Sequence, residues 1–239
     1  GPDQLQKAPD LYRPAPGREM LLEEFLAGEE ATFDCVFVGG RPVWHSIARY
    51  APSPLEVLEN PWIQWVVMLP RRIDGPEFAG IREVAPRAIA ALGLDTGVAH
   101  LEWFRRTDGS VAVSEVGARP PGAQICSLIS YAHDIDFYRA WALLAVHDHF
   151  EPPERRYAVG AAYFRGQGTG RVVGIEGLDQ AQREIGDLVV EARLPRPGQA
   201  KSTSYEGEGW AILRHPDTEV VQKALRRVVQ LVQVRMADA

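Results

Sequence analysis

Two runs of alternating apolar and polar residues flank an Asp-Gly dipeptide near the middle of the chain. The runs are 98–105 and 111–117, and Asp108-Gly109 lies between them. Asp-Gly is a preferred two-residue loop of a β-hairpin, so the sequence predicts two antiparallel strands joined by a tight turn.

The length of the loop decides which residues of the two strands face each other. If Asp108 and Gly109 alone form the loop, counting outward places Glu102 opposite Glu115, with Cβ atoms about 5 Å apart. Two like charges so placed destabilise a sheet unless a cation lies between them, and carboxylate oxygens favour Mg²⁺ or Mn²⁺. The alternative is a pair of solvated surface glutamates, because a slip of one residue would put the acids on opposite faces.

The composition indicates a globular protein with a core of its own. The chain has 239 residues, 46% of them hydrophobic, which is enough for one large domain or two small ones. Its net charge of −6 argues against a general nucleic-acid-binding protein. We see no membrane-spanning run and no signal peptide, so we expect a cytoplasmic protein with no membrane partner. Cys35 and Cys126 are expected to be buried reduced thiols.

The rest of the chain mixes strand-like and helix-like segments. Asp134 is the expected N-cap of the second of two short helices within 122–150. The pattern fits an α+β or α/β architecture around an antiparallel sheet, and we predict an α+β fold. The expected strands are 31–38, 43–50, 61–70, 157–165, 170–175, 187–193 and 208–213, and the other expected helices are 76–92, 178–184 and 217–233.

Three segments resemble motifs of the ATP-grasp superfamily, in particular its carboxylate–amine (L-amino-acid) ligases. Residues 21–34 resemble the adenine hinge and ribose segment of that family. His100-Leu101-Glu102 and residues 114–122 resemble its two metal-binding strands with the basic residue that follows. Each motif alone is weak, but their order and spacing together are fairly specific. The resemblance covers about residues 20–150, and residues 157–235 are more loosely similar to the C-terminal lobe of the amino-acid ligases.

The resemblance implies an enzyme that forms a carbon–nitrogen bond at the expense of ATP. Glu102 and Glu115 would hold Mg²⁺ or Mn²⁺ against the ATP phosphates while the γ-phosphoryl group passes to a small-molecule carboxylate. An amine substrate would then attack the acyl phosphate to give an amide or peptide bond. Arg119 would hold the acyl phosphate or the acid, although a surface arginine in a salt bridge is the alternative.

The first segment would bind the nucleotide. By the resemblance, Glu23 would accept from the adenine amino group, and the backbone of Glu24, Phe25 and Leu26 would bind the base. Glu30 would bind the ribose hydroxyls, with an acidic surface turn as the alternative. A flat apolar slot closed by a few polar groups suits a base.

The chain departs from the family pattern at two places. Gly117 stands where many ATP-grasp enzymes have an asparagine that completes the metal site, so fewer protein ligands are expected. Nothing before Leu21 resembles the N-terminal domain or the glycine-rich lobe that holds the ATP phosphates. His100 would lie opposite Gly117, on the same face as both acids, and either contact phosphate or metal or pack as a hydrogen-bonded histidine.

The chain therefore resembles the C-terminal part of such a ligase. We expect a disordered lead-in with a tag scar over 1–19, an incomplete metal and nucleotide domain over 20–150, and a C-terminal lobe over 151–239. On its own this part would be inactive, for want of the missing lobe or of a partner copy. The alternatives are a non-catalytic ATP-grasp-derived interaction module, one half of a split enzyme, and a metal-dependent hydrolase outside the family.

Overall fold

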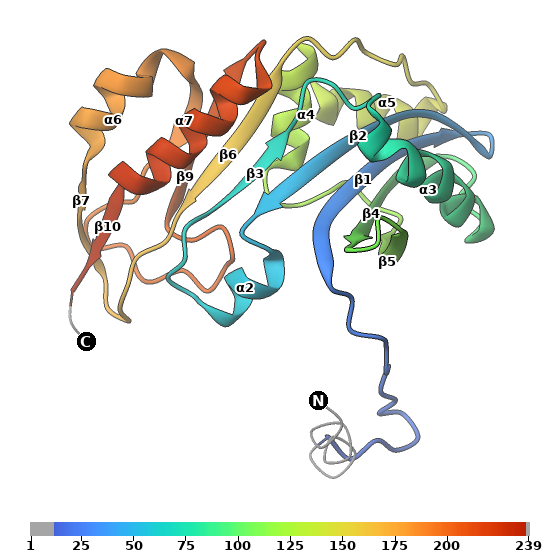
Figure 1. Cartoon of the computed structure of the whole chain (residues 1–239), viewed down its shortest axis with the longest axis horizontal. Helices are drawn as coiled ribbons and strands as arrows, with labels where there is room; N and C mark the ends of the chain where they lie inside the picture. Colours follow the sequence, from blue (N-terminus) through green and yellow to red (C-terminus); the bar gives the residue numbers. More distant parts are fainter. Residues whose placement is uncertain (1–11, 238–239) are drawn as a thin grey trace.

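The computed structural model describes residues 12–237, and the first part of the predicted lead-in lies outside that range. The described chain is an antiparallel sheet with packed helices, which confirms the predicted α+β class (Figure 1). The strands are β1 (Gly28–Val38), β2 (Arg41–Ala51), β3 (Trp65–Leu69), β4 (Gly97–Arg106), β5 (Val111–Gly117), β6 (Ala158–Phe164), β7 (Val172–Glu176), β8 (Val189–Arg193), β9 (Gly209–His215) and β10 (Gln233–Met236). The helices are α2 (Pro54–Glu59), α3 (Ala79–Ala91), α4 (Ile125–His133), α5 (Phe137–His147), α6 (Leu178–Ile185) and α7 (Thr218–Leu231), with short 3₁₀ turns at Pro76–Phe78 and Gly186–Leu188.

One eight-stranded sheet runs through the described chain in the order β5-β4-β1-β2-β3-β6-β9-β8. Every neighbouring pair in it is antiparallel. The sheet continues from β3 to β6 across the boundary predicted near residue 150. A separate two-stranded ribbon pairs β7 with β10.

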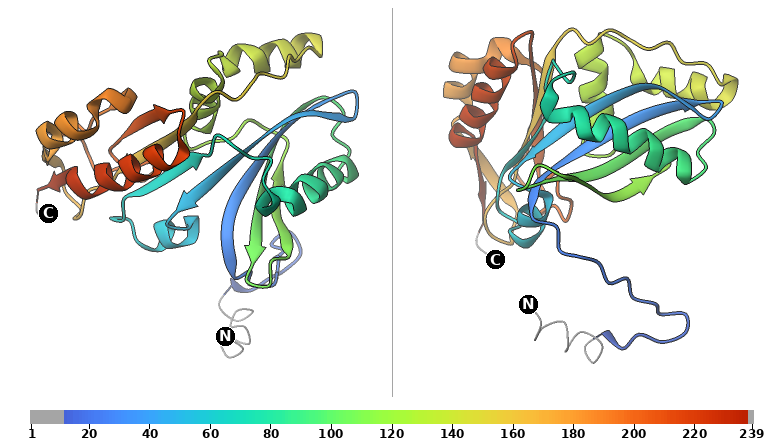
Figure 2. Two further views of the ribbon diagram at one scale, coloured as in Figure 1. Left: turned by 45° about the horizontal axis from the view of Figure 1, so that its top comes forward. Right: turned by 45° about the vertical axis from the view of Figure 1, so that its right-hand side comes forward.

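Helices cover the two faces of the sheet in different places. The helices α4 and α5 pack on one face, and α3, α6 and α7 pack on the other (Figure 2). The strand β6 is covered on both sides, since its side chains alternate between the α4 and α7 clusters and all seven residues are buried. The edge strand β5 is only half-buried. Near β5 the face that carries α4 is left open, and the candidate site lies there.

Most predicted elements are present, but two predictions are wrong. The last helix ends at Leu231, and the chain then forms β10, which gains its hydrogen bonds from the distant β7 rather than from neighbouring residues. Asp134 is the C-cap of α4, with a φ of 54°, and the N-cap of α5 is Asp136, whose carboxylate accepts from the Arg139 amide at 2.9 Å. An Asp two residues from another makes such caps hard to assign from sequence.

Pro86 neither ends nor divides its helix, since α3 runs from Ala79 to Ala91 around it. No helix within residues 12–237 combines the length and the apolar character that crossing a membrane requires.

Candidate functional site

The predicted facing of the two acids is confirmed. Glu102 of β4 pairs with Glu115 of β5, and on its other side it pairs with Thr32 of β1. The next row on the same face consists of Asp34, His100 and Gly117. Because paired residues point to the same face, three strands bring these polar groups together.

The assumed loop behind that prediction is wrong. The Arg106 amide donates to the Ser110 carbonyl at 2.9 Å, so three residues form the loop, with Gly109 at a φ of 84°. A bulge at Ser114 then adds one residue to β5, between the pairs Glu102–Glu115 and Trp103–Val113. The two shifts of one residue cancel, and the acids face each other after all.

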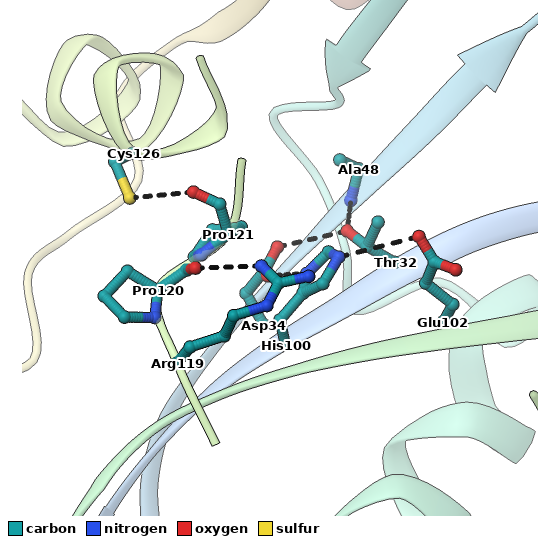
Figure 3. Close-up of polar contacts among 9 residues, drawn as sticks. All are labelled: Thr32, Asp34, Ala48, His100, Glu102, Arg119, Pro120, Pro121 and Cys126. Carbon is teal, nitrogen blue, oxygen red and sulfur yellow. Dashed lines mark hydrogen bonds and ion pairs between the residues drawn. The ribbon is translucent and has the colours of Figure 1, made fainter. Parts of the chain in front are cut away.

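A chain of polar contacts, most of them buried, leads from the backbone of β2 to Glu102 (Figure 3). The Ala48 amide donates to the Thr32 hydroxyl at 3.2 Å, and that hydroxyl donates to Asp34 Oδ2 at 3.1 Å. Asp34 Oδ1 lies 2.7 Å from His100 Nδ1, and His100 Nε2 lies 3.6 Å from Glu102 Oε1. Asp34 is fully buried, so its carboxylate fixes the imidazole with one nitrogen directed at Glu102.

These contacts set the charges of the network. Burial disfavours the imidazolium, but the hydrogen bonds to Asp34 and Glu102 outweigh it and raise the pKa of His100 to about 9. The hydrogen bond from His100 lowers the pKa of Glu102 in return. At neutral pH the network therefore holds a cationic His100 between the carboxylates of Asp34 and Glu102.

A hollow of about 390 Å³ opens over this network. His100, Glu102 and Arg119 form its polar side, and the aromatic rings of Tyr50, Trp65 and Tyr205 form much of the rest. Arg119 is exposed, and its Nη1 donates only to the neighbouring Pro120 carbonyl at 3.1 Å. Its guanidinium therefore keeps free donors beside Glu102.

The predicted nucleotide segment lines a second hollow of about 550 Å³. Glu23, Glu24, Phe25, Leu26 and Glu30 all contribute to its wall, together with part of β4 and β5. Burial, with the charge of Glu102 as a smaller cause, raises the pKa of Glu30 to about 7.

The adjacent Glu29 has a different environment from Glu30. Glu29 forms ion pairs with Arg49 and Arg105, so its role is structural. Alternation along β1 thus separates two neighbouring glutamates, one paired within the sheet and one at the hollow.

The paired acids are chemically suited to a hard cation. Glu102 is partly buried and Glu115 is exposed, and their oxygens are ligands that Mg²⁺ prefers. No cluster of three or more His, Cys, Asp or Glu side chains suited to a metal occurs within residues 12–237. A magnesium ion here would take its other ligands from phosphate oxygens and water, as is usual for that ion.

Several residues of the site were missed by the sequence reasoning. Asp34 is noticeable as an acid in an apolar strand, because a buried carboxylate needs partners. Tyr50 and Trp65 give no such signal. Tyr205 arrives from a loop far along the chain, and its carbonyl accepts from Trp65 Nε1 at 2.8 Å.

Comparison with known proteins gives relatives in structure only. Neither a protein-family model nor a curated protein matches this sequence. The L-amino acid ligase from Bacillus licheniformis matches with a TM-score of 0.72 at 21% identity, over 90% of this chain and 55% of that chain. Phosphoribosylglycinamide synthetase from Anaerococcus prevotii matches with a TM-score of 0.66 at 14% identity, over the same shares.

A third similar structure is carboxyaminoimidazole ribonucleotide synthase from Aspergillus clavatus, solved in complex with ATP. Its TM-score is 0.59 at 19% identity, over 87% of this chain and 52% of that chain. The present chain thus spans about half the length of the structures that it matches. These likenesses confirm the fold that the three sequence motifs predicted.

Proposed function

The chain has the ATP-grasp fold, and on that premise we propose that it is part of an ATP-dependent ligase that joins a carboxylate to an amine. One observation carries the proposal. Alternate residues of β4 point to the same face, so Phe104 and Arg106 line the larger hollow while His100 and Glu102 line the smaller one. A single strand thus connects the predicted nucleotide segment with the predicted metal acids.

In this proposal the larger hollow takes the nucleotide. The backbone of Glu24, Phe25 and Leu26 binds the base, Glu23 accepts from its amino group, and Glu30 binds the ribose. The similar synthase from Aspergillus clavatus was solved with ATP, which supports a nucleotide as the ligand.

The smaller hollow holds the reacting groups. Glu102 and Glu115 would bind Mg²⁺ or Mn²⁺, which would neutralise phosphate charge during phosphoryl transfer. The imidazolium of His100 is placed to contact phosphate and to keep Glu102 ionised. Arg119 would hold the substrate carboxylate with its planar fork. The similar ligase from Bacillus licheniformis supports an amino acid as one substrate class.

The proposal is tested by calorimetric titration of the whole chain with ATP and Mg²⁺. Glu115→Gln should weaken binding of ATP with Mg²⁺ at least about tenfold, because one of the two carboxylates proposed to bind the metal is replaced by a neutral amide. Glu83→Gln makes the same chemical change on an exposed face of α3 and should leave binding unchanged. If both variants bind ATP as the parent does, Glu115 is not a metal ligand and the proposed mechanism fails.

A second candidate function follows from the exposed apolar residues of the nucleotide segment. Leu21, Leu22 and Phe25 are 81%, 71% and 78% exposed. A cluster of exposed apolar side chains marks a contact surface, so a docking module is the alternative to a ligase. Binding of a partner protein by a chain that fails to bind ATP even with that partner present would favour the docking module.

A further inference from the structure

A second group of polar side chains lines a hollow of its own next to the buried network of the candidate site, since His45 pairs with Cys35, the residue after Asp34. Trp44 and His45 lie near the start of β2, Arg71 and Arg72 follow β3, and Arg155 precedes β6. Because β3 is antiparallel to both β2 and β6, the end of β3 lies beside the start of β6, and the chain that leaves β3 continues in the direction of the start of β2. The group, with His133 from the end of α4, lines a hollow of about 350 Å³.

Positive charge dominates this hollow. Arg71, Arg72 and Arg155 line it against a single carboxylate, Asp74. That carboxylate lies 3.8 Å from Arg72 Nε, and both side chains are largely exposed, so the pair is weak. Of the described carboxylates, none forms an ion pair with Arg155 or Arg71.

Arg155 is held in place by neutral groups. It donates to the Pro70 carbonyl at 2.7 Å and to the Ser46 hydroxyl at 2.5 Å, while its buried Nε has no partner. Asp34 stabilises the Arg155 cation through space, but that carboxylate is already hydrogen-bonded to Thr32 and His100. The guanidinium is thus fixed and charged, with donor capacity left over.

Unpartnered imidazole nitrogens complete the donor set. His133 is only 5% exposed, and neither of its ring nitrogens has a hydrogen-bond partner. The buried Nε2 of His45 also has none. The carbonyls of Pro153 and Glu154 favour a charged His133 without making a hydrogen bond to it. Buried polar groups without partners are uncommon and point to something that is bound there.

We propose that this hollow is a binding site for a small oxyanion, a phosphate or a carboxylate, distinct from the candidate ligase site. Planar guanidinium groups match the oxygens of both anions, and each neutral imidazole can donate one N–H to them. The two sites share no lining residue. An anion here would give Arg155 and His133 the partners that the protein itself does not supply.

The test is a titration of the whole chain with inorganic phosphate and, separately, with malonate, each at constant ionic strength with chloride. The side-chain NMR signals of His133 and His45 report binding at the hollow. We expect a saturable shift of both rings with at least one anion. The anion that binds more tightly shows whether the natural ligand bears a phosphate or a carboxylate group.

Three variants assign the binding to a place. Arg71→Gln combined with Arg72→Gln should weaken it about tenfold, since two partly solvated charges are lost. Arg87→Gln, an exposed arginine of α3 with a comparable surface ion pair, should leave it unchanged. Arg119→Gln should also leave it unchanged, which separates this hollow from phosphate bound at the candidate ligase site.

Two results would overturn the proposal. One is the absence of any saturable shift of the His133 ring with either anion beyond that caused by chloride. The other is binding that persists in the Arg71 and Arg72 double variant and disappears in Arg119→Gln.

Discussion

His100 and His133 are almost equally buried, yet their environments drive their charges in opposite directions. They are 6% and 5% exposed. His100 lies between Asp34 and Glu102, and its pKa is raised to about 9. Burial, reinforced by the charge of Arg155, lowers the pKa of His133 to about 4. Equal burial therefore does not fix the charge of a histidine here: neighbouring carboxylates outweigh burial at His100, whereas Arg155 adds to it at His133.

The comparison separates two kinds of polar site in one sheet. Around His100 the protein supplies opposite charges, so the site is nearly complete and leaves Glu102 ionised for a cation. Around His133 it supplies like charge and no hydrogen-bond partner, so the site is complete only with an anion. Substitutions at these residues should therefore change the free energy of unfolding by very different amounts.

The largest effect is expected from Asp34→Ala. It removes the buried partner of a charged histidine and should cost about 4 kcal/mol of unfolding free energy. Asp74→Ala removes an exposed carboxylate and should cost less than about 0.5 kcal/mol. Urea denaturation at neutral pH measures both. A loss below 1 kcal/mol for Asp34→Ala would mean that the network around His100 is not stabilising.

Next in size is Arg155→Met, which keeps a long side chain but removes the charge and both hydrogen bonds. Leaving the Pro70 carbonyl and the Ser46 hydroxyl without a donor should cost about 2 kcal/mol. The pKa of His133 should rise as the cation disappears, and NMR titration of the ring measures this. Arg156→Met alters the neighbouring, exposed arginine and should change neither quantity appreciably. An unchanged His133 pKa in Arg155→Met would contradict the role given to Arg155.

The pH dependence of stability should differ in sign between the two histidines. His133 has a folded pKa of about 4 against an ordinary value of 6.5. Between these values the unfolded chain binds the proton and the folded chain does not, so stability falls as the pH falls. The slope for one group reaches about 1.4 kcal/mol per pH unit. His133→Gln should flatten this acid limb, and His149→Gln, at an exposed position, should not.

His100 should act on the alkaline limb of metal-free protein. Its folded pKa of about 9 exceeds 6.5, so its contribution is fully present below pH 6.5 and is lost as the pH rises through 9. Between pH 7 and 10, the free energy of unfolding of His100→Gln should therefore fall less with rising pH than that of the parent. A parent protein with the same stability across that range would show that His100 is not held as a cation.

The sequence predicted the parts of this contrast that depend on local pattern. Alternation and the Asp-Gly turn placed Glu102 opposite Glu115 and His100 opposite Gly117, as the structure confirms. The loop was one residue longer than assumed, and only the bulge at Ser114 restored the pairing. A bulge has no clear signal in a single sequence. The predicted pairing is therefore correct only because the bulge offsets the extra loop residue.

What depends on distant segments could not be predicted. His133 at the end of α4 and Arg155 before β6 come from separate segments, and only the tertiary fold brings them to one hollow. Asp34 alternates with apolar residues along its strand, a pattern typical of a solvent-facing position, but in the structure it is fully buried. Its partner, His100, lies 66 residues away. Pairing across such distances is set by the sheet order, which local periodicity does not contain.

The smallest change in stability is expected from Glu115→Gln, and it sharpens the comparison most. Glu115 is exposed and faces a second carboxylate, so loss of its charge removes a repulsion rather than a bond. The free energy of unfolding should change by less than about 0.5 kcal/mol, with a slight gain as the expected direction. The same variant is expected to bind ATP and Mg²⁺ at least about tenfold more weakly, so stability and binding should change independently at this residue. A stability loss above 1 kcal/mol, measured by urea denaturation, would show that Glu115 is held by the fold. In that case the Glu115 carboxylate on the edge strand β5 would be occupied by contacts within the protein and would not be free to bind a ligand.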